Sequence, residues 1–236
     1  MNPYVAEFIG TALLILLGNG VVASIVLKES KAYNAGWLSI TVGWGLAVML
    51  AVYAVGSYSG AHLNPAVTVG LAVAGSFSWS EVPMYIVCQV AGAFLGALLV
   101  WLHFKPHWEK TTDADTKLAV FCTGPAIRNT ASNLISEIIG TAVLVLGLLF
   151  IGANKFAEGL NPAIVGLLIV SIGLSLGGTT GFAINPARDF GPRLAHAILP
   201  IPGKRDADWS YSWIPIVGPI AGGVIGALIY QLLIAG

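Results

Sequence analysis

The chain of 236 residues is 56% apolar and 9% charged, and its 11 basic and 11 acidic side chains give a formal net charge of zero. With a mean hydropathy of +0.83, this composition excludes an ordinary soluble domain, in which about a quarter of the residues are charged. No basic run of the kind that binds nucleic acid is present. The sequence therefore predicts a membrane protein that is surrounded by the lipid bilayer and has no nucleic-acid partner.

Hydropathy predicts six membrane spans of about 20 residues each, enough to cross a hydrocarbon core of about 30 Å. In chain order they lie near residues 4–27, 36–57, 82–104, 132–153, 160–179 and 211–235. Two further apolar pieces, near 62–77 and 183–199, are too short to cross. We expect these two pieces to be re-entrant half-helices.

Each half-helix opens with an Asn-Pro-Ala triplet, which is a helix-start pattern. Asn is a favoured N-cap, and Pro fits the first helical position because its missing N–H would be unpaired there. A helix that starts inside membrane-buried sequence leaves backbone groups unpaired, which is tolerated where they line a cavity. The two triplets therefore predict a shared polar path. They comprise Asn64, Pro65, Ala66, Asn185, Pro186 and Ala187.

A third triplet, Asn161-Pro162-Ala163, follows a polar stretch and opens a full-length span. Its context differs from that of the other two, so it is interpreted as an ordinary helix start. We expect Asn161 to be the N-cap and Pro162 to lie in the first turn.

The chain contains an internal repeat. Glu7, Gly10 and Thr11 recur as Glu137, Gly140 and Thr141. Two halves, about 1–104 and 132–236, each hold three spans and one half-helix, and a polar loop at about 105–131 joins them. An odd number of crossings inverts the second half relative to the first, so the two half-helices can meet near the midplane. The predicted fold is a single all-α channel domain with six membrane helices and two re-entrant half-helices.

Glycines at GxxxG spacing occur at matching places in the two halves. They are Gly92 and Gly96 in the first half, and Gly222 and Gly226 in the second. Such spacing permits close helix contact in lipid, and we expect it to pack the two halves against each other.

The segments SGAHLNPAVT and TGFAINPARDFGP resemble the two signature loops of the major intrinsic proteins, the aquaporin family. The resemblance extends over nearly the whole chain. It implies the aquaporin fold and a passive channel without a cofactor, in a homotetramer with one pore per subunit. It also implies cytoplasmic termini, although most Lys and Arg would then lie outside, against the positive-inside tendency. The short ends indicate a bacterial plasma membrane.

The residue types at the triplets indicate how a pore could work. Capping uses the side-chain oxygens of Asn64 and Asn185, so their NH2 donors are expected to be free to point into the lumen. Two positive helix ends would repel cations, and a water that gives its oxygen to both donors would break a proton wire. Loop carbonyls are expected to accept hydrogen bonds from the solute. They belong to Gly60, Ala61, His62, Gly181, Phe182 and Ala183.

By resemblance, four residues form the outer constriction of the pore, and they are Trp44, Gly173, Phe182 and Arg188. A water-selective member of the family has His in place of Gly173 and a small residue or Cys in place of Phe182. The wider constriction, with aromatic faces opposite a guanidinium, suits an alkyl chain that bears hydroxyls. The sequence RDFGPR, with Asp189 and Arg193, also resembles the glycerol-facilitator subfamily.

Two carboxylates, Glu7 and Glu137, occupy matching positions in spans. Ionisable groups there are functional candidates, and a proton-coupled transporter could use them. The resemblance implies instead that each accepts hydrogen bonds from the backbone of a re-entrant loop. His62 is left open between a role in the pore wall and a role in pH gating.

No metal or catalytic pattern is found. His103, His107 and His196 do not have ligand or triad spacing, and Cys88 and Cys122 are too differently placed to suggest a disulfide or a metal site. An enzyme is therefore not expected.

Three functions remain. The first is a facilitator for glycerol and similar small neutral solutes, with water passing as well. The second is a mainly water-selective channel, which Gly173 and Phe182 disfavour, and the third is a secondary transporter. Candidate solutes of suitable size are glycerol, water, dihydroxyacetone, urea, hydrogen peroxide and protonated lactic acid.

Overall fold

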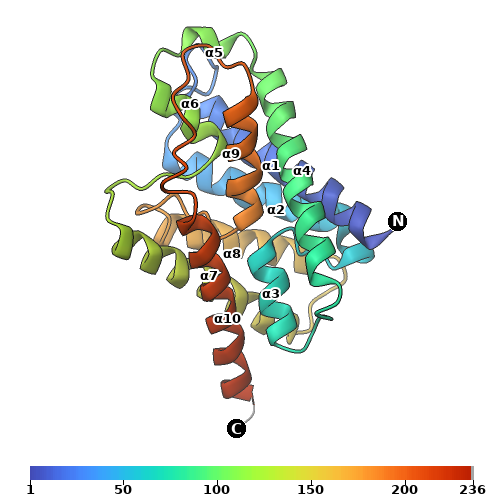
Figure 1. Ribbon diagram of the computed structural model, residues 1–236. Coiled ribbons are helices and arrows are strands. Elements are labelled where there is room, and N and C mark those ends of the chain that lie inside the picture. Colours follow the sequence, from blue (N-terminus) through green and yellow to red (C-terminus); the bar gives the residue numbers. More distant parts are fainter. Residues whose placement is uncertain (235–236) are drawn as a thin grey trace.

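The computed structural model describes residues 1–234, and all regular elements in that range are helices (Figure 1). The first half contains α1 (Pro3–Val26), α2 (Trp37–Ser59), α3 (Pro65–Val73) and α4 (Val82–His103). The second half contains α7 (Thr130–Gly152), α8 (Asn161–Ser175), α9 (Pro186–Ile198) and α10 (Ile214–Ile234). Two short helices, α5 (His107–Lys110) and α6 (Ala114–Phe121), lie between the halves. Residue 235 of the last predicted span lies outside the described residues.

Within residues 1–234, five helices are long and apolar enough to cross a membrane, namely α1, α2, α4, α7 and α10. The helix predicted over 160–179 is shorter, because α8 has 15 residues and ends at Ser175. At 1.5 Å per residue, α8 is about 22 Å long. It stops there because residues 176–180, which include Gly177 and Gly178, form turns that lead into the second re-entrant loop.

The helices of each half pack in the same way. In the first half α1 contacts α2 and α4, and in the second half α7 contacts α8 and α10. A Cβ on Gly92 would lie 2.2 Å from the carbonyl oxygen of Phe8, and one on Gly222 would lie 2.3 Å from that of Ile138. The GxxxG pairs therefore bring α4 onto α1 and α10 onto α7. The expectation that they join the two halves was wrong, because these glycine faces are turned toward the first helix of their own half.

The halves meet through other contacts, in which each half-helix packs against the last long helix of the opposite half. Thus α3 contacts α10 and α9 contacts α4, while α2 contacts α8. A Cβ on Gly45 would lie 2.7 Å from the carbonyl oxygen of Gly166, and one on Gly223 would lie 2.6 Å from that of Ala66. Close backbone approach between the halves therefore depends on glycines that are not part of the GxxxG pattern.

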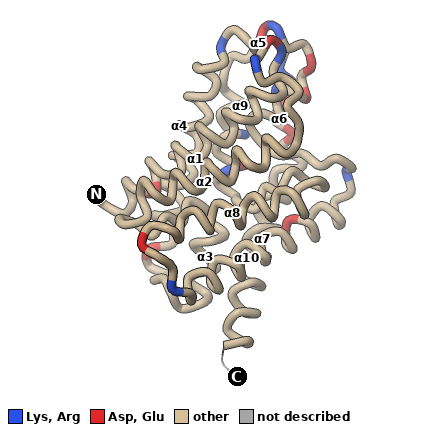
Figure 2. Tube along the Cα trace, turned by 180° about the vertical axis from the view of Figure 1, so that it is seen from behind, with Lys and Arg blue, Asp and Glu red and all other residues tan. Residues whose placement is uncertain are grey.

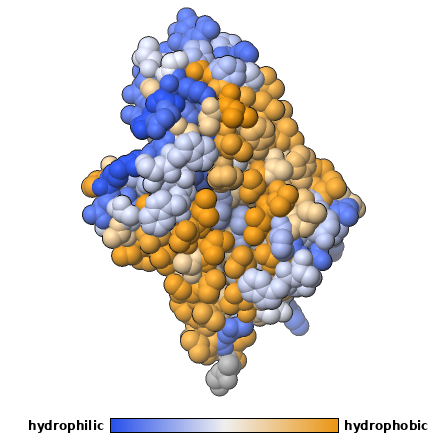
Figure 3. Space-filling model, in the orientation of Figure 1, coloured by the Kyte–Doolittle hydropathy of each residue, from blue (hydrophilic) through white to orange (hydrophobic). Residues whose placement is uncertain are grey.

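The connecting segment, predicted only as a polar loop, contains α5 and α6, and its buried apolar residues join the hydrophobic core of the membrane helices. The rings of Trp108 and Phe121 are buried and stacked, with centroids 5.5 Å apart. Charged residues gather around this segment at one end of the molecule (Figure 2). Hydrophobic residues cover much of the face seen in Figure 3. Exposed apolar side chains such as Val87 and Leu167, 60% and 62% exposed, fit contact with lipid.

Candidate functional site

The two half-helices begin as their sequences predict. Asn64 has an extended backbone and its Oδ1 accepts the N–H of Ala66 at 2.8 Å. Asn185 is also extended, and its Oδ1 accepts the N–H of Ala187 at 3.0 Å and that of Arg188 at 3.2 Å. In each case Pro occupies the first helical position. The N-termini of α3 and α9 are therefore fixed by side-chain caps.

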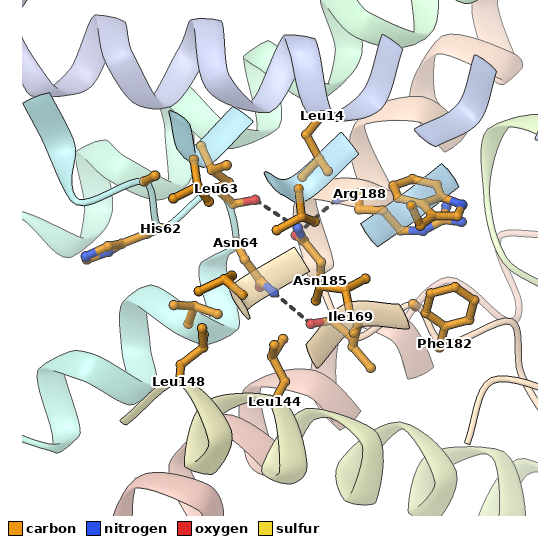
Figure 4. Close-up of a pocket in the computed structure, with 18 residues that line it drawn as sticks. Leu14, His62, Leu63, Asn64, Leu144, Leu148, Ile169, Phe182, Asn185 and Arg188 are labelled. Carbon is orange, nitrogen blue, oxygen red and sulfur yellow. Dashed lines mark hydrogen bonds between the residues drawn. The ribbon is translucent and has the colours of Figure 1, made fainter. Parts of the chain in front are cut away.

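The two triplets are joined by reciprocal hydrogen bonds (Figure 4). Asn64 Nδ2 donates to the carbonyl oxygen of Ile184 at 2.8 Å, and Asn185 Nδ2 donates to that of Leu63 at 2.8 Å. The expectation that both NH2 groups are free was therefore wrong in part. Each amide uses one N–H on the opposite loop, because the facing loop offers a carbonyl at that point. One N–H on each Asn remains to face the cavity that both residues line.

The loops that precede the triplets have an unusual backbone, and it is the same in both. Ala61 and Leu63 in the first loop have φ of 50° and 54°, and Phe182 and Ile184 in the second have φ of 40° and 42°. A non-glycine residue with positive φ costs about 1–3 kcal/mol. The surrounding structure must therefore hold both loops in place.

Two buried carboxylates hold these loops. Glu7 accepts the backbone N–H groups of His62 at 2.9 Å and Leu63 at 2.7 Å, and Glu137 accepts those of Ala183 at 3.0 Å and Ile184 at 2.8 Å. A hydroxyl completes each set, from Ser59 at 2.6 Å and from Thr180 at 2.7 Å. Since these donors replace the water lost on burial, the charges are tolerated.

One member of the first set was not predicted from the sequence. Gln89 Nε2 donates to Glu7 at 2.8 Å and to the hydroxyl of Thr68 at 2.9 Å. Its signal was present, because Gln89 is a polar amide inside an apolar span. The matching position in the second half is Pro219, which has no donor to offer.

A cavity follows the two loops and has walls of opposite character. Figure 4 shows the Asn pair between His62 on one side and Phe182 and Arg188 on the other. The apolar wall comes from α1, α2, α7 and α8, and includes Leu14, Val48, Val52, Leu144, Leu148, Val165 and Ile169. The polar side comes from the loops, the two Asn amides and Arg188. A molecule in this cavity would meet hydrocarbon on one flank and hydrogen-bonding groups on the other.

Three of the four residues assigned to the constriction line one end of this cavity. The Arg188 guanidinium lies over the Trp44 ring, 4.4 Å from its centroid, and Nη1 donates to the carbonyl oxygen of Phe121 at 3.5 Å. Phe182 packs edge-on against Trp37 with centroids 5.7 Å apart. The cation–π contact with Trp44 and the hydrogen bond to the Phe121 carbonyl together hold the guanidinium at one side of the cavity.

Gly173 is the fourth, and it does not itself line the cavity. A Cβ at this position would lie 3.1 Å from Phe182 Cζ and 2.9 Å from Thr41 Cγ2. Phe182 therefore occupies the space that a side chain at position 173 would need.

Asp189 and Arg193 lie away from the cavity and form a buried ion pair at 2.8 Å. Arg193 also donates to the carbonyl oxygens of Thr123 at 2.9 Å and Ala207 at 2.7 Å, while Asp189 accepts the N–H of Thr123 at 2.8 Å. This pair ties α9 to the connecting segment and to the loop before α10. Its contribution to the site is structural support.

His62 lines the cavity at the end away from Arg188. Its Nδ1 lies 3.1 Å from the hydroxyl of Thr68, which itself donates to the carbonyl oxygen of Asn64 at 3.0 Å. Because that hydroxyl proton is already used, Nδ1 of His62 must be the donor. The ring also packs against Phe77 at 4.5 Å.

The third triplet does not reach the cavity, since none of its residues lines it. Leu160 occupies the cap position of α8 without a side-chain hydrogen bond, and Asn161 is the first helical residue. The expectation that Asn161 is the N-cap was wrong by one position, because the carbonyl oxygen of Leu160 already accepts the N–H groups of Ala163 and Ile164. Among residues 1–234, no three His, Cys, Asp or Glu side chains are placed to hold a metal ion.

Comparison with known proteins agrees with this geometry. The family model described as "Major intrinsic protein" matches residues 1–230. The chain is 67% identical to the probable glycerol uptake facilitator protein of Thermotoga maritima, over 99% of this chain and 100% of that one. It is 58% identical to the glycerol uptake facilitator protein of Bacillus subtilis, over 100% and 86% of the two chains. The X-ray structure of the aquaglyceroporin from Plasmodium falciparum matches with a TM-score of 0.86 and 31% identity, over 98% and 96% of the chains.

Proposed function

Because the chain belongs to the major intrinsic protein family, we propose that it is a passive channel for glycerol and similar small uncharged solutes. Water passes through the same channel. The observation that carries the proposal is the two-sided cavity, in which apolar side chains face a row of hydrogen-bonding groups. Glycerol has the matching shape, with a carbon chain along one edge and three hydroxyls along the other.

Transport through this cavity requires that lost hydration be replaced by protein groups. Solute hydroxyls donate to the loop carbonyls of Ala61, His62, Phe182 and Ala183, whereas Gly60 and Gly181, also expected from the sequence, do not line the cavity. The hydroxyls accept from the remaining N–H of Asn64 and of Asn185 and from Arg188. The carbon chain lies against Leu144, Leu148 and other apolar residues of the opposite wall.

The same groups exclude ions and protons. The positive N-terminal ends of α3 and α9 face each other at the Asn pair and repel cations. A water molecule at this point gives its oxygen to the free N–H groups of Asn64 and Asn185. It cannot then accept a proton from a neighbouring water, so a proton wire is interrupted.

The constriction formed by Trp44, Phe182 and Arg188, with Gly173 behind Phe182, selects the solute by size. A His at position 173 would need the space of the Phe182 ring, which lies 3.1 Å from the site of its Cβ. The Gly173 and Phe182 combination therefore gives an aromatic wall without an imidazole, which suits glycerol better than a filter for water alone.

Further features follow from the family resemblance. The protein forms a homotetramer with one pore per subunit, and lies in a bacterial plasma membrane with both termini in the cytoplasm. Dihydroxyacetone, urea, hydrogen peroxide and protonated lactic acid are further permeants, since each is uncharged and of suitable size. Glu7 and Glu137 support the loops and do not carry protons, because each carboxylate is occupied by backbone N–H groups of a loop and by side-chain donors beside it.

Stopped-flow light scattering on proteoliposomes tests the proposal. The wild type is compared with a double variant, Gly173→His and Phe182→Cys, in which removal of the ring makes room for the imidazole. We expect fast, non-saturating glycerol flux without an ion gradient in the wild type, and loss of glycerol flux with retained water flux in the variant. Water flux alone in the wild type would support a water-selective channel, and saturating uptake driven by an ion gradient would support a transporter.

A further inference from the structure

Helix α6 does not line the constriction, but its last residue contacts Arg188 of the constriction. Phe121 is the last residue of α6, and the final carbonyls of a helix have no partner within it. The Phe121 carbonyl oxygen is therefore free to accept Arg188 Nη1 at 3.5 Å. The negative end of the α6 dipole also favours a cation at this place.

Asn19 of α1 binds the same carbonyl. Its Nδ2 donates to the Phe121 oxygen at 3.1 Å, and the side chain is fully buried. Since a carbonyl can only accept, the amide nitrogen must face it, which fixes the orientation of the side chain. One carbonyl thus connects Asn19 to Arg188.

The neighbouring residue, Gly18, contacts the other part of the constriction. A Cβ on Gly18 would lie 2.3–2.5 Å from three atoms of the Trp44 ring. The indole therefore rests directly on the α1 backbone, and the absence of a side chain sets how far it withdraws from the cavity. The Arg188 guanidinium lies over the ring of the same indole, 4.4 Å from the ring centroid.

The second half has different residues at the matching positions of its first helix. Gly18 and Asn19 correspond to Leu148 and Leu149, since Glu7 corresponds to Glu137 and Thr11 to Thr141. Within residues 1–234 no donor reaches Asn19 Oδ1, and a buried polar atom without a partner is destabilising. An apolar residue would be favoured here if packing alone mattered, as at Leu149. The polar residue occurs only in the half whose first helix backs the constriction.

We propose that Gly18 and Asn19 are positioning residues for solute selection. Gly18 sets the depth of the Trp44 indole, and Asn19 orients the Phe121 carbonyl that holds the Arg188 guanidinium aside. This inference rests on the proposed function, in which Trp44 and Arg188 belong to the constriction. Neither positioning residue touches the solute.

The ratio of glycerol to water permeability in proteoliposomes tests the inference, because a change in the number of folded channels alters both permeabilities equally and leaves the ratio unchanged. Asn19→Leu introduces the residue found at the matching position of the other half. Gly18→Ala pushes the indole toward the cavity. We expect each change to lower the ratio by about threefold or more, since glycerol needs more room than water and loses a positioned hydrogen-bond donor.

Leu149→Ala is the matched control, because it truncates a buried side chain at the equivalent place and is expected to leave the ratio unchanged. Asn19→Ser, which is too short to reach Phe121, replaces Asn19→Leu if that variant is not recovered folded. An unchanged ratio in both the Gly18 and the Asn19 variants would overturn the inference. The double variant Gly173→His and Phe182→Cys distinguishes this failure from a failure of the proposed constriction. If only the positioning role is wrong, the double variant still loses glycerol flux.

Discussion

The loop that leads to Asn64 and the loop that leads to Asn185 share one backbone and one kind of anchor, but their surroundings differ. In both, a buried Glu accepts two backbone N–H groups and a hydroxyl. Four residues after each Asn the halves diverge, because Thr68 bonds His62 and Gln89 whereas Asp189 pairs with Arg193. The repeated groups thus shape the path, and the unrepeated groups give its two ends different properties.

Removal of a loop anchor is expected to have the largest effect. Glu137→Leu leaves two strained backbone N–H groups and a buried hydroxyl without an acceptor. We expect a loss of about 5 kcal/mol of stability and no glycerol flux. Thermal unfolding in detergent, together with flux in proteoliposomes, measures this. Glu7→Leu should cost at least as much, because it also removes one of the two acceptors of Gln89 Nε2. A native-like melting temperature in either variant would contradict the shared role.

The next effect tests the difference between the halves. Arg193→Met leaves Asp189 as a buried charge without its ion-pair partner, which should cost about 3–5 kcal/mol. Thr68→Val, at the place in the first half that matches Asp189, removes no charge and should cost about 1–2 kcal/mol. Both are measured by thermal unfolding in detergent. Equal losses would mean that the ion pair contributes no more than its uncharged counterpart.

The caps test what the halves share. Asn64→Ala removes one capping bond and Asn185→Ala removes two, and each variant also removes one bond to the opposite loop. Because a lost cap costs about 1 kcal/mol and a lost hydrogen bond about the same, we expect similar losses of about 2 kcal/mol. Asn161→Ala is the matched control, because Asn161 is no cap in its triplet, and its loss should stay below about 0.5 kcal/mol. Denaturant or thermal unfolding compares the three, and clearly unequal losses at Asn64 and Asn185 would show that the two starts are not equivalent.

The smallest effect concerns α6, which carries Phe121. Asp113 caps α6, and the backbone hydrogen bond from Thr116 holds the pKa of Asp113 below its ordinary value of 3.8. A lowered pKa adds stability above the unfolded-state pKa, and this stability is lost as the pH falls through the folded-state pKa. Asp113→Ala should therefore lower the melting temperature slightly at pH 7, and the difference should shrink as the pH falls through the folded-state pKa of Asp113. Glu109→Ala, on the neighbouring α5, is the control, and a difference that persists in acid would contradict the capping role.

Local patterns made the helix starts and the repeat predictable. An Asn cap followed by Pro acts within four residues, so Asn64 and Asn185 could be placed from sequence. The contacts that complete the site could not, because Asn19 and Phe121 are 102 residues apart and Asn64 and Ile184 are 120 apart. The free amide donors were overestimated for the same reason, since the competing carbonyl belongs to the other half. The GxxxG pattern indicated close contact correctly but not which helix would be the neighbour.

The crossed bonds between the two triplets also bear on the order in which the chain assembles in a bilayer. The carbonyl oxygen of Leu63 bonds to Asn185, and the amide nitrogen of Asn64 bonds to Ile184. The first half therefore cannot complete its share of the lumen until the second half has been inserted. We expect the aqueous path to be completed in one of the last steps of assembly, when the second half binds to a first half that is already inserted. Two separately synthesised halves would then conduct no solute alone and would conduct only after they had associated.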